Sequence, residues 1–190
     1  MKNLILIIML VLSSFRAVGG LLTCKSGLNV RKSVASRSRT RRDLTTTIYI
    51  VGKKTGGEEW IATGIEEYEK RLRPSMTCKT TFCKTDDDLV KAFEAAWKKK
   101  GAVFTLDEKG EQYTSRDFST LVFGALIEGG SNLSVFIGGA SGLPRAIRTA
   151  PVPKISLSKM TWTHQHARLL LMEQLYRATE IRKGSNYHKD

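Results

Sequence analysis

From residue 46 to the C-terminus, strand-like and helix-like segments alternate along the chain. The strand-like segments are short runs of Val, Ile, Phe and Thr, whereas the helix-like segments carry apolar residues at intervals of three and four. Helix ends are also marked: Pro74 forbids continuation of the first helix, and Thr85 followed by three aspartates is typical of a helix start.

This alternation predicts an α/β domain with a mainly parallel sheet. The expected strands are 47–51, 76–84, 102–106, 133–137 and 154–157. The expected helices are 58–72, 85–100, 115–128 (with Ser115 as its cap) and 163–183.

The most informative loop follows the expected strand 133–137. It reads Gly-Gly-Ala-Ser-Gly over 138–142 and lacks the side-chain bulk of a core segment. In a parallel α/β sheet, ligands bind beyond the carboxyl ends of the strands, where loops diverge and backbone N–H groups are free. The loops after 102–106 and 154–157 belong to the same edge. The sequence therefore predicts a ligand site built from three loops, although a glycine-rich loop alone often only turns the chain.

The formal charge of +13 is unevenly distributed. Residues 1–45 carry nine Lys or Arg against a single Asp and contribute +8, which leaves +5 for the remaining 145 residues. A mildly basic domain is compatible with an RNA partner but does not by itself identify one.

The first 45 residues have the composition of a targeting presequence, and the domain is expected to span 46–190. Lys2 precedes nine apolar residues at 4–12, too few to cross a bilayer, and residues 1–20 have the form of a signal peptide. Residues 21–45 are rich in Arg and Ser, as transit peptides are. Together they resemble a bipartite plastid presequence, whose removal would leave no stable membrane association. The alternatives are a secretory signal, a mitochondrial presequence and a basic arm that binds RNA.

The cysteines and histidines indicate neither a disulfide nor a metal site. Cys24 lies in the expected presequence, while Cys78 and Cys83 are five positions apart on one strand and so point to opposite faces. Both are expected to be buried free thiols. The three histidines lack the acidic and cysteine neighbours of a metal centre, and no Rossmann or P-loop pattern follows the first strand.

Five blocks in the second half of the chain resemble the signature of one protein family. They are Ile-Gly-Gly-Ala-Ser-Gly-Leu at 137–143, Leu-Ser-Lys-Met-Thr at 157–161, His-Gln at 164–165, Met-Glu-Gln-Leu-Tyr-Arg at 172–177 and Asn-Tyr-His-Lys at 186–189. In order and spacing they are similar to the RlmH family of the SPOUT superfamily. These knotted methyltransferases use S-adenosylmethionine to methylate N3 of a pseudouridine in large-subunit ribosomal RNA. The resemblance spans residues 47–189.

The resemblance implies a SPOUT-type fold with a C-terminal trefoil knot, a homodimer and a cofactor site. The cofactor, S-adenosylmethionine, needs an apolar slot for its adenine and backbone groups for hydrogen bonds. The family's cofactor contacts fall on Leu106, Gly138, Leu157, Ser158, Lys159, Met160, Thr161 and Trp162. Taken singly, Leu106 also fits an ordinary core position and Gly138 an ordinary turn. On this basis Gly138→Trp is expected to fill the slot and abolish cofactor binding.

Methylation of N3 requires the N3 proton to leave while the ring attacks the methyl group in line with sulfur. The candidate catalytic residues are His164, Arg168, Tyr187 and His188, with Arg177 as a further phosphate or charge ligand. Tyr187 is suited to stacking on a base. Each of these residues also fits an ordinary surface position, and none is singled out as the catalytic base.

Three departures from the family pattern stand out. Bacterial members usually have a longer, basic and helical segment at the place where Lys84 here leads almost directly to Asp86. Thr163 stands where the family frequently has a proline. Asp190 adds a negative charge to the tail. The sequence is thus interpreted as a homodimeric, plastid-targeted methyltransferase of large-subunit ribosomal RNA. The alternatives are a non-catalytic SPOUT module that binds ribosomal RNA during assembly, and a secreted non-catalytic protein.

Overall fold

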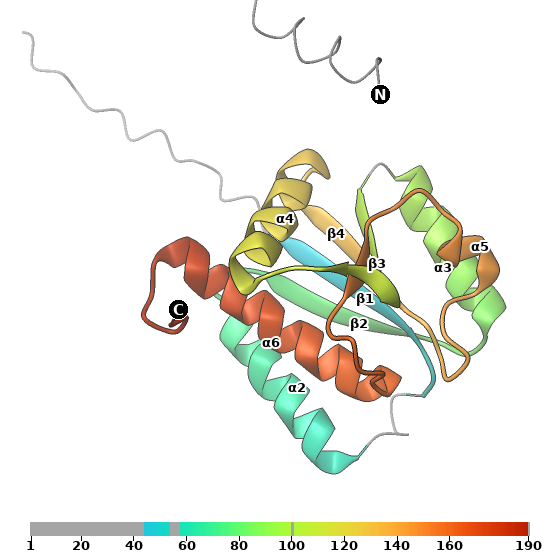
Figure 1. The fold of residues 1–190 in the computed structure, drawn as a ribbon, viewed down its shortest axis with the longest axis horizontal. Helices are drawn as coiled ribbons and strands as arrows, with labels where there is room; N and C mark the ends of the chain where they lie inside the picture. Colours follow the sequence, from blue (N-terminus) through green and yellow to red (C-terminus); the bar gives the residue numbers. More distant parts are fainter. Residues whose placement is uncertain (1–43, 54–57, 100, 190) are drawn as a thin grey trace, which may run out of the picture. The chain divides into compact units, whose positions relative to one another are not determined.

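A five-stranded parallel sheet forms the centre of the molecule (Figure 1). The computed structural model describes residues 44–53, 58–99 and 101–189. The strands follow the order β2-β1-β4-β3-β5, and every neighbouring pair is parallel. Their bounds are Thr45–Val51 (β1), Thr77–Cys83 (β2), Ala102–Gln112 (β3), Asn132–Ile137 (β4) and Lys154–Ser156 (β5). The predicted α/β class is therefore confirmed, while the trefoil knot stays a prediction.

Helices cover both faces of the sheet (Figure 1). They are Glu59–Leu72 (α2), Asp86–Lys98 (α3), Ser115–Glu128 (α4), Arg145–Arg148 (α5) and His164–Lys183 (α6). The larger core joins α2, α4 and α6 to one face, and the smaller core joins α3 and α5 to the other. Helix α6 packs between α2 and α4, so its position depends on both.

Side-chain alternation explains why β1 joins the two cores. Ile48 and Ile50 are fully buried on the side of α2 and α6, whereas Tyr49 and Val51 pack on the side of α3. Its neighbour β4 ends in three consecutive buried apolar residues, 135–137, because both of its faces are covered there.

Helix caps set where α3, α4 and α6 begin. Thr85 caps α3 as predicted, because its hydroxyl accepts a hydrogen bond from the Asp88 amide. The cap of α4 is Thr114, and the expectation of Ser115 is wrong by one residue, since it is the Thr114 hydroxyl that accepts from the Asp117 amide. Thr163 caps α6.

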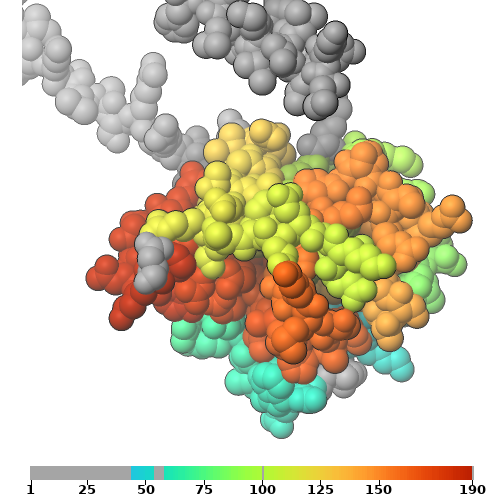
Figure 2. Space-filling view, in the orientation of Figure 1, coloured from blue at the N-terminus to red at the C-terminus, as the bar shows by residue number. Residues whose placement is uncertain are grey.

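Two elements differ from the sequence prediction. Strand β3 does not end at Leu106 but continues to Gln112, with an irregularity in which Leu106 and Glu111 both pair with Ile155. Beyond Leu106 it runs over the surface beside the segment that follows β5 (Figure 2). The short helix α5 was not expected, because four residues after Pro144 are too few for a periodic pattern.

Cys78 and Cys83 are free thiols that belong to opposite sides of the sheet, as their spacing predicts. Cys83 is buried and Cys78 is half-buried. Burial raises the pKa of the Cys78 thiol to about 12, and the nearby charge of Glu69 adds to this effect. Burial also raises the pKa of the Cys83 thiol, so the protonated form is favoured at both cysteines.

The expected presequence lies outside the described residues except for Leu44 and Thr45, where β1 begins. Among the described residues, no helix has the length and apolar composition needed to pass through a lipid bilayer.

Gly110 is expected to be essential for the pairing of β3 with β5. A Cβ at this position would lie 2.6 Å from the Lys154 carbonyl oxygen and 2.8 Å from the Ile155 carbonyl carbon. Because both obstacles are backbone atoms, Gly110→Ala should destabilise the fold by about 1–3 kcal/mol, measured by thermal unfolding. Gly124→Ala in α4 is the matched control.

A Cβ at Gly124 meets nothing within 4 Å. Alanine is favoured over glycine in a helix, so this variant should gain about 0.5–1 kcal/mol. Equal melting temperatures for the two variants would contradict the close approach of β3 to β5.

Candidate active site

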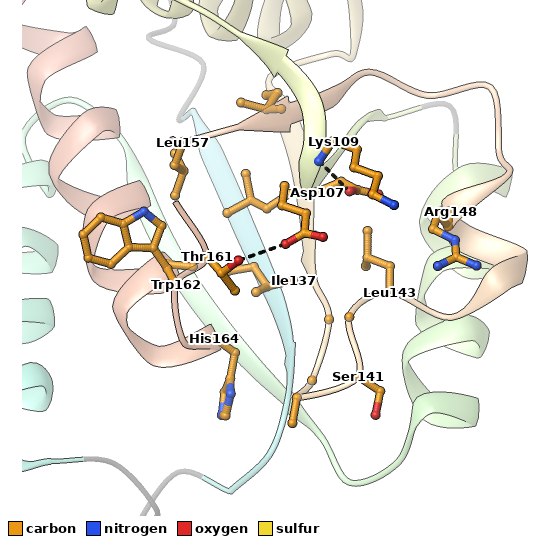
Figure 3. A pocket seen from close by; sticks show the side chains of 18 of the residues that line it. Asp107, Lys109, Ile137, Ser141, Leu143, Arg148, Leu157, Thr161, Trp162 and His164 are labelled. Carbon is orange, nitrogen blue, oxygen red and sulfur yellow. Dashed lines mark hydrogen bonds between the residues drawn. The ribbon is translucent and has the colours of Figure 1, made fainter. Parts of the chain in front are cut away.

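A cavity of about 350 Å³ opens beside the middle of β3 and the carboxyl ends of β4 and β5 (Figure 3). This volume lies within the range of about 300–1,000 Å³ that is usual for small-molecule sites. It is built by part of β3 and by the loops after β4 and β5, with contributions from α5 and α6. The lining residues are 106–109, 137–143, Arg148, Ile155, Leu157, Ser158, 160–162, His164 and Ala167.

The glycine loop after β4 folds tightly back on itself. A Cβ on Gly138 would lie 2.2 Å from the Gly142 carbonyl carbon, and Gly142 has a φ of +79°. The amide of Gly142 donates to the carbonyl of Gly139 at 3.0 Å. Position 138 therefore requires glycine because of backbone contact, and position 142 because of its left-handed conformation. The loop presents mainly backbone to the cavity, as predicted for a ligand loop.

Residues 157–162, which follow β5, form another wall of the cavity. The Ser156 hydroxyl donates to the Ser158 carbonyl at 2.8 Å, and the Met160 amide donates to the Ser158 hydroxyl at 3.0 Å. Thr161 Oγ1 donates to Glu108 Oε2 at 3.1 Å (Figure 3). These bonds shape the segment around the cavity.

The structure brings together at this cavity all but one of the residues predicted for the cofactor. Those that line it are Leu106, Gly138, Leu157, Ser158, Met160, Thr161 and Trp162. Lys159 is exposed and does not line the cavity. Their role in cofactor binding stays a prediction.

Charged residues that sequence reasoning missed also line the cavity. Asp107, Glu108 and Lys109 belong to the part of β3 that was expected to be a loop, and Arg148 belongs to the unexpected α5. The Lys109 amide donates to Asp107 Oδ1 at 2.9 Å (Figure 3). The signal available was their position directly after a buried strand end, where functional side chains gather in parallel sheets. The cavity thus combines acidic and basic groups with an apolar wall.

His164 is the one predicted catalytic residue that lies at the cavity (Figure 3). It is the first residue of α6, directly after the Thr163 cap. Its Nε2 atom faces the end of β1, because a Cβ built on Gly52 would lie 3.6 Å from it. The helix start therefore fixes this imidazole between β1 and the cavity.

Arg168 does not line the cavity. Its side chain is buried, its guanidinium lies 5.1 Å from the centre of the Phe82 ring, and its Nε and Nη1 atoms have no hydrogen-bond partner among the described residues. Burial lowers the pKa of Arg168, which the charge of Glu69 partly opposes.

Tyr187 and His188 lie near Arg177, toward the other end of α6. Arg177 forms an ion pair of 2.6 Å with Glu173, its guanidinium lies 4.9 Å from the centre of the Tyr187 ring, and its Nη1 is 3.3 Å from His188 Nδ1. The Tyr187 hydroxyl donates to Glu173 Oε1 at 3.2 Å. Burial, followed by hydrogen bonding to Tyr68, raises the pKa of Tyr187, so its hydroxyl stays protonated.

The cluster formed by Glu173, Arg177, Tyr187 and His188 is separated from the cavity. With a rise of about 1.5 Å per residue, Arg177 lies about 20 Å along α6 from His164. Within one chain, the predicted catalytic residues are therefore found in three places.

An aromatic cluster that the sequence analysis did not identify joins the starts of α2 and α6. The His166 ring lies 5.3 Å from the Trp60 ring and 6.4 Å from the Trp162 ring. Both indoles are exposed, Trp60 by 54% and Trp162 by 42%. Trp162 also lines the cavity, so this apolar surface adjoins the site.

Among the described residues, no group of three or more His, Cys, Asp or Glu side chains is arranged to hold a metal ion. The histidines instead take part in the aromatic, cavity and tail contacts described above.

Comparison with known proteins gives a consistent picture. Residues 44–188 match the model of a family described as predicted SPOUT methyltransferase. The chain is 40% identical over 143 residues to the ribosomal RNA large subunit methyltransferase H of Protochlamydia amoebophila, covering 75% of this chain and 96% of that protein. It is 37% identical over 160 residues to the protein of the same name from Ruminiclostridium cellulolyticum, covering 75% of this chain and 98% of that protein.

A solved structure is also similar, that of the SpoU methyltransferase AviRb from Streptomyces viridochromogenes. The TM-score is 0.42 at 14% sequence identity, and the match covers 76% of this chain and 62% of AviRb. From the family model and the identity to its relatives, the chain belongs to the SPOUT methyltransferase family, in the group of the ribosomal RNA large subunit methyltransferases H.

Proposed function

We propose that the chain transfers a methyl group from S-adenosylmethionine to large-subunit ribosomal RNA. The observation that carries this proposal is the convergence of part of β3 and the loops after β4 and β5 on one cavity, because these segments hold seven of the eight residues that the family resemblance assigns to the cofactor. Membership of the family and the names of its relatives support the same activity.

The cavity suits this cofactor chemically. Leu106, Ile137 and Ile155 offer an apolar wall to a flat adenine, and the glycine loop offers backbone groups without side-chain bulk. Asp107, Lys109 and Arg148 match the opposite charges of an amino-acid group. When bound there, S-adenosylmethionine would supply an electrophilic methyl group on its sulfonium.

N3 of a pseudouridine is the proposed target atom. This part rests on the family resemblance, and the chemistry requires a group that accepts or guides the N3 proton. We assign this task to His164, because its imidazole is the predicted catalytic group that lies at the cavity. Arg168 is buried away from the cavity, so its proposed part is to hold α6 against β2.

A homodimer would account for the remaining candidates. Tyr187, His188 and Arg177 cannot reach the cavity of their own chain, since α6 separates them from it. If two copies pair through the exposed surface around Trp60 and Trp162, the tail of one copy can approach the cavity of the other. A two-fold axis would then produce two equivalent composite sites.

The N-terminal composition supports an organelle location, with the plastid as the proposed compartment and the mitochondrion as the alternative. A tagged full-length chain found outside both organelles would contradict this part of the proposal.

The decisive experiment titrates the compact unit Thr40–Asp190 with S-adenosylmethionine by calorimetry and then supplies unmodified large ribosomal subunits. Binding together with methyl transfer to a pseudouridine, located by mass spectrometry of nucleosides, is the expected result. Absence of cofactor binding would favour the alternative, a SPOUT module that binds ribosomal RNA during assembly without catalysis.

Gly138→Ala is expected to abolish measurable cofactor binding. The sequence-based prediction used Gly138→Trp to fill the slot, but the structure shows that even one added carbon meets the Gly142 and Leu143 backbone. Gly139→Ala is the matched control, since its Cβ would lie 3.4 Å from the Val51 side chain and need only a small adjustment. Equal affinities of the two variants, measured by calorimetry, would place the cofactor elsewhere.

Mixed dimers test the composite site. His164→Ala subunits and Tyr187→Ala/His188→Ala subunits should each be inactive alone. Random re-association of equal amounts should restore about a quarter of the original transfer rate, because half of the dimers would then contain one intact site of two. A mixture that stays inactive while dimers form would show that each chain uses its own tail or none.

A further inference from the structure

We propose that Glu108 is a positioning residue that fastens the wall 157–162 across the cavity through its hydrogen bond with Thr161. The bond joins two segments that are far apart in sequence, at a Thr161 Oγ1 to Glu108 Oε2 distance of 3.1 Å. The effect of Glu108 on cofactor binding rests on the proposed function, whereas its effect on the position of residues 157–162 does not.

Glu108 is available for this contact because β3 continues past the cavity. The strand passes Leu106, leaves the regular register and pairs again with β5 at Glu111. Gly110 permits that return, since its Cα lies against the Lys154 and Ile155 backbone. Glu108 therefore lines the cavity, and its carboxylate accepts the hydrogen bond from Thr161 in the segment that follows β5.

The outer end of the wall 157–162 depends on a contact from outside the segment. Its inner end is held by the hydrogen bonds among Ser156, Ser158 and Met160, and its outer end is exposed, with Met160 at 69%. The Thr161–Glu108 bond lies at that outer end, one residue before Trp162 and three before His164. It links the cavity wall, which leads to the aromatic surface and the start of α6, to strand β3.

Loss of this bond should loosen the wall rather than unfold the domain. Both partners are exposed, so the bond is expected to change a local opening equilibrium about three- to tenfold. Since the wall lines the cavity, S-adenosylmethionine should dissociate faster by a similar factor, while the melting temperature stays unchanged.

The test uses the full chain and two readouts. Millisecond hydrogen exchange of residues 157–162, measured without cofactor, should become about three- to tenfold faster in Glu108→Ala and in Thr161→Val. Glu108→Gln keeps an acceptor oxygen and should restore the original rate. Glu111→Ala removes a carboxylate from the same strand that bonds instead to Tyr113, and it should leave the rate unchanged.

The second readout is the dissociation rate of S-adenosylmethionine. The effects of Glu108→Ala and Thr161→Val on both rates should not add in the double variant, because each removes the same bond. Unchanged exchange in Glu108→Ala, or equal acceleration in Glu111→Ala, would overturn the inference. If exchange responds as expected but the unmodified chain binds no S-adenosylmethionine, the fastening stands and the proposed function fails.

Discussion

The contact between Gly138 and the backbone of Gly142 and Leu143 is the constraint on which the site depends. This loop leaves the central strand β4 and turns back within van der Waals distance of itself, so no side chain can occupy position 138. The turn keeps the end of β4 clear and leads the chain into α5 and then β5. Because β3 and β5 are neighbours in the sheet, the segments beyond them then face the same space. A local steric requirement therefore determines where a cavity can form.

Much of the fold was predictable because its strands and helix ends have strong local causes. Residues 135–137 are apolar since β4 is covered on both faces there, and Thr85 is followed by aspartates since carboxylates favour a helix start. The cofactor segments were predictable for a different reason. The positions came from family resemblance, and the parallel topology explains why they share one edge.

The extension of β3 was not predictable in this way. Asp107, Glu108 and Lys109 are polar and resemble a loop, and the strand forms there only because β5 supplies a partner. Pairing with a distant strand leaves no local periodicity. The charged part of the cavity was missed for the same reason. Within one chain α6 holds Tyr187 and His188 away from His164, and the catalytic roles of all three residues stay predictions.

The hydroxyl of Thr163 has two roles at the start of α6. It accepts a hydrogen bond from the His166 amide, which caps the helix, and it lies 2.7 Å from His166 Nδ1, which orients the ring between Trp60 and Trp162. His164 is the next residue in the chain. The same hydroxyl therefore orients the His166 ring beside the two indoles and fixes the start of the helix. One threonine thus holds both the aromatic surface and the first turn of the helix that carries His164 to the cavity.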